Sequence, residues 1–248
     1  MQSATESAEI GDVITAGGIE TNVHIRRHPT SSDTVLLLHG SGPGVSAFAN
    51  WRLTLPYLEQ EMTVIAPDIV GFGFTERPAD VSYDLETWTA HAVDVLDALG
   101  VARAHVVGNS FGGALALSLA AHHPHRVDRM VLMGAVGVRF DITRGLDSVW
   151  AYEPSVENMR AIMEFFAYDK SLLGDDLAEL RYQASIRPGV QEAFHAMFPE
   201  PRQAALDALC LPEDQVRKIE TPTLLVLSLI HISEPTRRRG ISYAVFCL

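Results

Sequence analysis

The stretch Ala104-His105-Val106-Val107-Gly108-Asn109-Ser110-Phe111-Gly112-Gly113 decides the fold. A short apolar strand here turns sharply into the helical run 114–122, and the turn carries a G-x-S-x-G motif centred on Ser110. In such a turn the serine takes a strained backbone conformation, and the two glycines let strand and helix approach closely. A glycine-rich turn with an incidental serine is the alternative. Because the motif has the strand before it and the helix after it that it requires, we interpret Ser110 as a candidate nucleophile.

Two backbone segments are candidate donors for an oxyanion. Ser110 precedes a helix, so the N–H of Phe111 points at an oxyanion formed on an attacked acyl group. A second apolar strand, 34–38, runs into His39-Gly40-Ser41-Gly42-Pro43-Gly44, whose glycines allow the backbone to aim N–H groups at a ligand. This loop alone could be a plain strand-to-helix connection. Paired with the Ser110 turn, it predicts an oxyanion hole, and His39 at the strand end is interpreted as a packing residue rather than the base.

Composition and charge bound the class of protein. With 248 residues, of which 47% are hydrophobic, the chain is long enough to bury one large core. The net charge of -12 argues against nucleic acid and anionic membrane surfaces as partners. No apolar run approaches roughly 20 residues, and the polar N-terminus lacks the pattern of a signal peptide. Two cysteines, Cys210 and Cys247, give no disulfide framework, so we expect a cytoplasmic protein.

The sequence predicts no metal site. It has no C-x-x-C or H-E-x-x-H spacing, and the cluster His122-His123-Pro124-His125 is interpreted as a solvated helix end, because no carboxylate or cysteine lies near it. Asp68, between Pro67 and a glycine-rich run, is a candidate carboxylate, but an Asp in that setting is more often a turn former.

The remaining pattern predicts an α/β protein. A hairpin is expected from 11–16 and 19–26, and helices from 50–60 and 85–99. Further strands are expected at 63–66 and 127–134, with a buried strand at 221–226. Strands that alternate with helices are typical of a mostly parallel sheet covered on both faces.

The alternation stops between 140 and 207, where the pattern is helical and rich in aromatic residues and methionine. We interpret this insertion as a cap over the mouth of an active site; a helical subdomain with its own core is the alternative. Arg181 and Arg187 in it could each hold a carboxylate bidentately, or be exposed structural residues. The predicted organisation is thus a core over 1–139, a cap over 140–207 and a return to the core over 208–226.

The chain resembles the α/β-hydrolases, and within them the meta-cleavage-product hydrolases, which break carbon–carbon bonds in ring-fission products of aromatic compounds. Within that group it looks closest to the hydrolases of 2-hydroxymuconate semialdehyde. The resemblance covers about 10–226 and rests on His39-Gly40-Ser41-Gly42-Pro43-Gly44, Asn50-Trp51-Arg52, Gly108-Asn109-Ser110-Phe111-Gly112-Gly113 and Tyr182-Gln183-Ala184-Ser185-Ile186-Arg187-Pro188-Gly189.

The resemblance implies a role for each matched residue. Ser110 is then the nucleophile, and the N–H groups of Ser41 and Phe111 form the oxyanion hole. The expected substrate-binding residues are Gly40, Gly42, Asn50, Asn109 and Arg187. The implied reaction converts 2-hydroxymuconate semialdehyde to 2-hydroxypenta-2,4-dienoate and formate, with no cofactor or metal, and the enzyme could be a homo-oligomer. A carboxylesterase of the same fold is the alternative.

The family order of Ser, Asp and His is incomplete in this sequence. The Asp expected just after 223–226 and the His expected near the C-terminus do not appear. Instead, 227–237 is the translation of a transposase-type sequencing adaptor. After an index-sized gap of three residues, 241–248 is the translation of the flanking adaptor. We therefore expect 227–248 to be non-native and the hydrolase to be truncated and at best weakly active. A non-catalytic binding protein is a further alternative.

Overall fold

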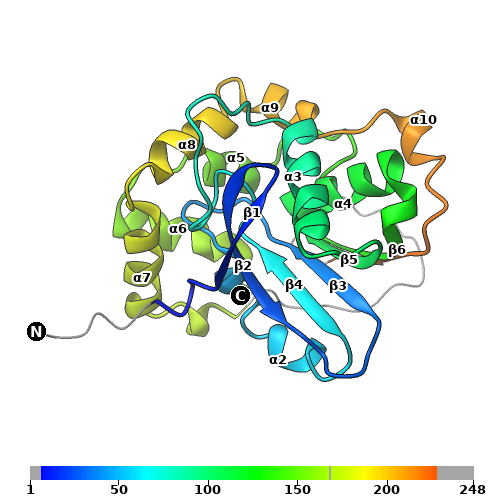
Figure 1. Cartoon of the computed structure of the whole chain (residues 1–248). Helices are drawn as coiled ribbons and strands as arrows, with labels where there is room; N and C mark the ends of the chain where they lie inside the picture. Colours follow the sequence, from blue (N-terminus) through cyan, green and yellow to red (C-terminus); the bar gives the residue numbers. More distant parts are fainter. Residues whose placement is uncertain (1–6, 168, 228–248) are drawn as a thin grey trace, which may run out of the picture.

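The computed structural model describes residues 7–167 and 169–227 of the chain. A seven-stranded sheet in the order β1-β2-β4-β3-β5-β6-β7 forms its centre (Figure 1). The antiparallel pairs are β1 with β2 and β2 with β4, and all other neighbours are parallel. The strands are β1 (Asp12–Ala16), β2 (Ile19–Arg26), β3 (Thr34–Leu38), β4 (Thr63–Pro67), β5 (Ala104–Asn109), β6 (Val127–Met133) and β7 (Thr223–Val226). The predicted α/β class and mostly parallel sheet are confirmed.

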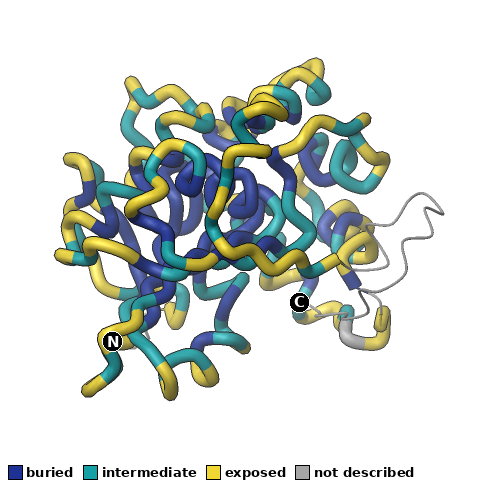
Figure 2. Tube along the Cα trace, turned by 90° about the vertical axis from the view of Figure 1, so that its right-hand side faces the viewer, coloured by how far each residue is buried: buried dark blue, intermediate teal, exposed yellow. Residues whose placement is uncertain are grey.

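Helices cover both faces of the sheet because the central strands are apolar on both faces. Leu36 and Leu38 of β3 belong to a core cluster with α3 (Leu85–Ala98) and α4 (Phe111–His122). Val35 and Leu37 point the other way and pack with α1 (Ala47–Trp51) and α2 (Leu55–Leu58). Successive side chains of a strand alternate between faces, so one five-residue strand serves both cores. Figure 2 shows the buried residues gathered in the centre, with exposed residues around them.

One prediction about secondary structure and one about burial are wrong. The single helix expected over 50–60 is two short helices, α1 and α2. Ser46 caps α1 by accepting a hydrogen bond from the N–H of Ala49, and Pro56 lies in the first turn of α2, where proline starts a helix and does not continue one. The strand expected to be buried at 221–226 is β7. Its Leu224 and Leu225 are exposed, because β6 is its one described neighbour in the sheet.

A run of helices separates β6 from β7, as the sequence pattern predicts. It comprises α5 (Arg144–Trp150), α6 (Val156–Phe166), η2 (Lys170–Leu172), α7 (Asp175–Ser185), α8 (Val190–Met197) and α9 (Arg202–Ala208), and α10 (Glu213–Val216) follows it. We call α5 to α9 the helical segment. Figure 1 places it beyond the sheet end to which β4 points. The division into core and cap remains a prediction, and the tail expected at 227–248 lies, except for Leu227, outside the described residues. No helix in the described ranges is both long and apolar enough to cross a bilayer.

Candidate active site

Ser110 connects β5 to α4 in a conformation that L residues rarely adopt. Its φ is 52° and its ψ is -111°, and within the described ranges it is the one non-glycine residue with positive φ. Neighbouring backbone fixes the turn: the N–H of Ser110 donates to Met133 at 2.9 Å, and its carbonyl accepts from Gly113 and Val136 at 2.9 and 3.1 Å. Strain of this kind persists only where the surroundings hold it. The expected tight turn at Ser110 is thus present.

The glycines around Ser110 are needed because backbones meet there. A Cβ on Gly108 would lie 2.3 Å from the carbonyl oxygen of Gly112, and one on Gly112 would lie 2.2 Å from that of Leu38. A Cβ on Gly113 would lie 2.2 Å from the Cβ of Ala135. The start of α4 therefore touches β5, the end of β3 and the chain after β6 at once.

The loop after β3 lies beside this turn. A Cβ on Gly40 would be 3.6 Å from that of Ser110 and 3.4 Å from the Asn109 amide nitrogen. The Asn50 side-chain oxygen accepts two hydrogen bonds, from the Gly40 N–H at 2.8 Å and from the Asn109 amide at 3.0 Å. The structure thus brings together four of the residues expected at the site, and Asn50 joins the loop to the end of β5.

The helical segment holds the same loop from the opposite side. The indole N–H of Trp150 donates to the Ser41 hydroxyl at 3.1 Å, and Trp150 is itself stacked on Phe198. Gly44, at φ +68°, leaves only 2.5 Å between an added Cβ and the backbone of Ala184. Gly42 lies between these anchors in sequence, and an added Cβ there would be in ordinary contact with Val45 at 3.8 Å. We call 40–44 the glycine loop.

Two buried histidines support the next loop along the sheet and are not available as bases. His39 donates from Nδ1 to the Gly40 carbonyl at 2.8 Å and accepts at Nε2 from the Ile69 N–H at 3.0 Å. His91 accepts from the Val70 N–H at 3.2 Å and bonds the Thr21 hydroxyl. Burial lowers the pKa of each imidazole to about 4. Both rings are therefore neutral at pH 7, as the interpretation of His39 as a packing residue requires.

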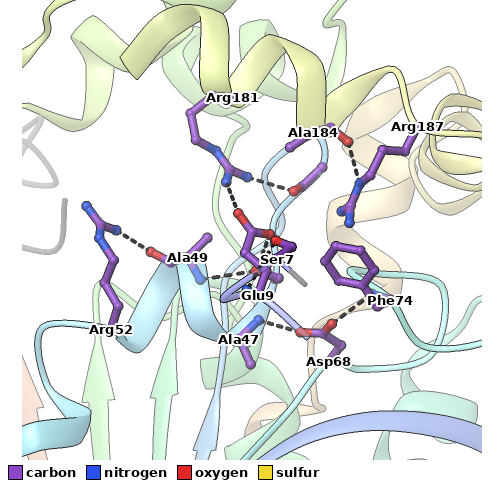
Figure 3. A network of polar contacts seen from close by, with 12 residues as sticks. Ser7, Glu9, Ala47, Ala49, Arg52, Asp68, Phe74, Arg181, Ala184 and Arg187 are labelled. Carbon is purple, nitrogen blue, oxygen red and sulfur yellow. Dashed lines mark hydrogen bonds and ion pairs between the residues drawn. The ribbon is translucent and has the colours of Figure 1, made fainter. Parts of the chain in front are cut away.

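Asp68 is more than the turn former expected from its neighbours. Its fully buried carboxylate accepts hydrogen bonds from the Ala47 N–H, the Phe74 N–H and the Asn22 amide, at 2.5, 2.8 and 2.8 Å. It therefore joins α1, the loop after β4 and β2, and Figure 3 shows its contacts to Ala47 and Phe74. Burial raises the pKa of Asp68 to about 6, and the three donors oppose that rise.

The two candidate arginines lie in different surroundings. Figure 3 shows the guanidinium of Arg181 directed at Glu9, whereas that of Arg187 lies over the ring of Phe74. Arg181 is paired with Glu9 and donates to the Gly44 carbonyl at 2.7 Å. The Nε of Arg187 donates a hydrogen bond to the Ala184 carbonyl. Its buried Nη2 has no hydrogen-bond partner among the described residues. Arg187 therefore keeps a free donor, whereas both Nη atoms of Arg181 are occupied.

Ser110 lies beside one candidate donor, the N–H of Phe111, and has no hydrogen-bonded base among the described residues. Phe111 is the first residue of α4, so its N–H has no acceptor inside the helix. The Ser110 hydroxyl makes no hydrogen bond to another described residue, and the described residues contain no cluster of His, Cys, Asp or Glu suited to a metal. Sequence reasoning missed Glu9 and Trp150. A single acidic or aromatic residue carries no local pattern, so only packing identifies their contacts.

Comparison with known proteins agrees with this geometry. A model described as alpha/beta hydrolase fold matches residues 33–205. The chain is 57% identical to 2-hydroxy-6-oxo-2,4-heptadienoate hydrolase of Pseudomonas putida strain F1, over 89% of this chain and 79% of the relative. It is 53% identical to 2-hydroxymuconate semialdehyde hydrolase of Pseudomonas sp. strain CF600, over 91% of this chain and 79% of that protein.

A solved structure shares the arrangement as well. The meta-cleavage product hydrolase of Pseudomonas fluorescens IP01, as a serine-to-alanine mutant complexed with acetates, superposes with a TM-score of 0.87 at 52% identity. The match covers 89% of this chain and 80% of that one.

The first prediction is that the unfolding free energy falls as the pH is lowered from about 6.5 to about 4. Below pH 6.5 the unfolded chain protonates its histidines, whereas folded His39 and His91 stay neutral until about pH 4. Asp68 acts in the opposite sense, because its folded pKa of about 6 exceeds the ordinary 3.8. Two imidazoles outweigh one carboxyl, so the net loss is on the order of 3 kcal/mol. Urea unfolding followed by tryptophan fluorescence across this pH range measures it, and His91→Gln should flatten the slope. Stability that rises toward pH 4 would contradict the prediction.

The second prediction concerns Gly112→Ala. The new methyl group meets backbone oxygen of Leu38 and His39, which cannot move as a side chain can, so we expect a loss of about 3 kcal/mol or more. Gly174→Ala is the control for steric contact, since nothing lies within 4 Å of an added Cβ there. Because Gly174 is the N-cap of α7, where alanine is less favourable than glycine, a loss of up to about 1 kcal/mol is expected. Denaturant unfolding of the two variants compares them. Equal stability of both would show that α4 does not approach β3 as closely as described.

Proposed function

The chain belongs to the α/β hydrolase fold family, and from this premise we propose that it is a serine hydrolase of the meta-cleavage-product group, acting on 2-hydroxy-6-oxohexa-2,4-dienoates. The observation that carries the proposal is Ser110 at φ 52° between β5 and α4, with the glycine loop beside it. The curated relatives named above act on substrates of this class, and 2-hydroxymuconate semialdehyde is the substrate that we propose first.

The proposed chemistry uses backbone donors on both sides of Ser110. The dienol first ketonises, which places a methylene next to the C6 carbonyl. The Ser110 oxygen then attacks C6, and the N–H groups of Ser41 and Phe111 stabilise the oxyanion. The C5–C6 bond breaks, and its electron pair moves through the conjugated system to the C2 oxygen, which takes a proton to give 2-hydroxypenta-2,4-dienoate. Water releases the acyl group from Ser110 as formate.

The other end of the substrate requires polar and cationic groups. The proposed contacts of the enol or keto oxygen are Gly40, Gly42, Asn50 and Asn109. In support, Asn50 bonds both the Gly40 N–H and the Asn109 amide, and Gly40 lies beside Ser110. Arg187 offers a buried, unused guanidinium nitrogen to the carboxylate. In this proposal the helical segment acts as a cap that carries the charge recognition. The substrate carbonyl system accepts the electrons, so no metal or cofactor is needed.

We also propose the setting of the reaction. A net charge of -12 disfavours nucleic acid as a partner, and the small number of cysteines suits the cytoplasm. The base that activates Ser110 is proposed to come from a segment after β7, as the family order of Ser, Asp and His suggests. Activity tests therefore use a chimera in which residues from Leu227 onward are replaced by the corresponding C-terminal part of the 57% identical P. putida relative.

The third prediction is that Ser110→Ala in this chimera abolishes cleavage of the dienoate but leaves binding intact. The substitution removes one hydroxyl, and the backbone donors and Arg187 remain in place. Loss of the absorbance of the yellow dienoate measures cleavage, with a decrease of at least about a thousandfold expected. Retained binding appears as a spectral shift of the bound dienoate. Cleavage within a few-fold of the unmutated chimera would show that Ser110 is not the nucleophile.

The fourth prediction is that Arg187→Gln lowers kcat/KM on the dienoate about tenfold to a hundredfold. Loss of a charge-assisted hydrogen bond to a carboxylate costs about 1.5 to 3 kcal/mol. Hydrolysis of an uncharged nitrophenyl ester should change little, because that substrate has no carboxylate for Arg187 to hold.

Arg181→Gln is the matched control, since Arg181 is already occupied by Glu9 and Gly44. It should affect the dienoate and the ester to the same degree. The two roles would be reversed if Arg187→Gln lowered kcat/KM equally on both substrates while Arg181→Gln lowered it only on the dienoate.

A further inference from the structure

Glu9 lies before the first strand, but hydrogen bonds hold it against β2 and α1. Its carbonyl accepts hydrogen bonds from the Asn22 amide at 3.0 Å and from His24 Nε2 at 3.1 Å. Its carboxylate accepts from the Ser46 hydroxyl at 2.8 Å, and Ser46 is the residue that caps α1. The Glu9 side chain is only 16% exposed. The carboxylate is therefore held at a fixed place beside α1.

The same carboxylate is the described ion-pair partner of Arg181 from α7. The Nη1 of Arg181 lies 3.4 Å from Oε1 of Glu9, and the arginine side chain is 17% exposed. Burial lowers the pKa of Arg181, and Glu9 opposes that effect. A buried guanidinium without a carboxylate is costly, so the position of Arg181 depends on Glu9.

The other terminal nitrogen of Arg181 holds the glycine loop. Nη2 donates to the Gly44 carbonyl at 2.7 Å, at the point where the loop touches the end of α7. The loop has three further side-chain anchors, which are His39 at the Gly40 carbonyl, Asn50 at the Gly40 N–H and Trp150 at Ser41. Only the Gly44 anchor depends on a charge that a second residue must balance.

We propose that Glu9 is a positioning residue for the glycine loop, acting through Arg181 to hold the Gly44 carbonyl and so fix the backbone that presents the Ser41 N–H. The kinetic part of this inference rests on the proposed function; the structural part does not. Because oxyanion donors act most strongly on the transition state, loosening the loop lowers kcat more than it raises KM.

The structural part is tested on the full chain, without any need for activity. Glu9→Gln keeps the shape of the side chain and an acceptor for Ser46 but removes the charge that pairs with Arg181. Hydrogen–deuterium exchange of the amides in 41–46 should become at least about fivefold faster. Glu20→Gln, which changes an exposed glutamate on β2, is the matched control and should leave that exchange unchanged. Exchange unchanged in Glu9→Gln would overturn the proposal.

The kinetic part is tested in the chimera with both the dienoate and the neutral nitrophenyl ester. Glu9→Gln should lower kcat about tenfold on both substrates and change KM less than about twofold, because the oxyanion hole serves both reactions. The double variant Glu9→Gln, Arg181→Gln should lose no more than Arg181→Gln alone, since the two residues act in series. A purely structural role would lower Tm and leave kcat unchanged, which would contradict the proposal. Should the unmutated chimera hydrolyse the ester but not the dienoate, the proposed function fails and the ester assay still decides on Glu9.

Discussion

At the turn after β5, three backbone segments meet at distances that leave no room for a Cβ, and the other features of the site depend on that approach. The start of α4 contacts β5 through Gly108 and the end of β3 through Gly112. This close packing holds Ser110 at φ 52° and brings the first free N–H of α4 near the glycine loop. Ser110 and the glycine loop thus become neighbours because one helix starts against two strands.

Buried polar groups support the loops that surround this turn. His39 and His91 accept hydrogen bonds from consecutive backbone N–H groups, those of Ile69 and Val70, and they can do so only as neutral rings. Asp68 beside them accepts three donors from separate elements. Unpaired N–H groups would be costly at this depth, so the histidines are needed to keep the shape of the loop after β4. The same histidines make the stability of the fold depend on pH. The groups that set the loop geometry are therefore also the ones that make folding depend on protonation.

The features that the sequence predicts are those encoded within a few residues of one another. The turn at Ser110, the glycine loop and the α/β alternation follow from short motifs and apolar periods, and the structure has all three. Asn50 is 59 positions from Asn109, and both are predicted as site residues because the short motifs around them resemble those of a known family. The contacts of Glu9, 172 positions from Arg181, have no local signature. The exposure of β7 and the break between α1 and α2 likewise depend on neighbours in space and on one proline.

In the proposed function, reactivity and substrate choice lie on different parts of the chain. The sheet and its loops supply Ser110 and the backbone donors, which suit any acyl carbon. The helical segment supplies two arginines in different surroundings. Arg181 is paired with Glu9, whereas a buried nitrogen of Arg187 has no hydrogen-bond partner among the described residues. A buried cation without a carboxylate is stabilised by an anionic ligand. Changes in the helical segment can therefore alter which anion is bound without disturbing the strained turn, provided that the Arg181 contact to Gly44 is kept.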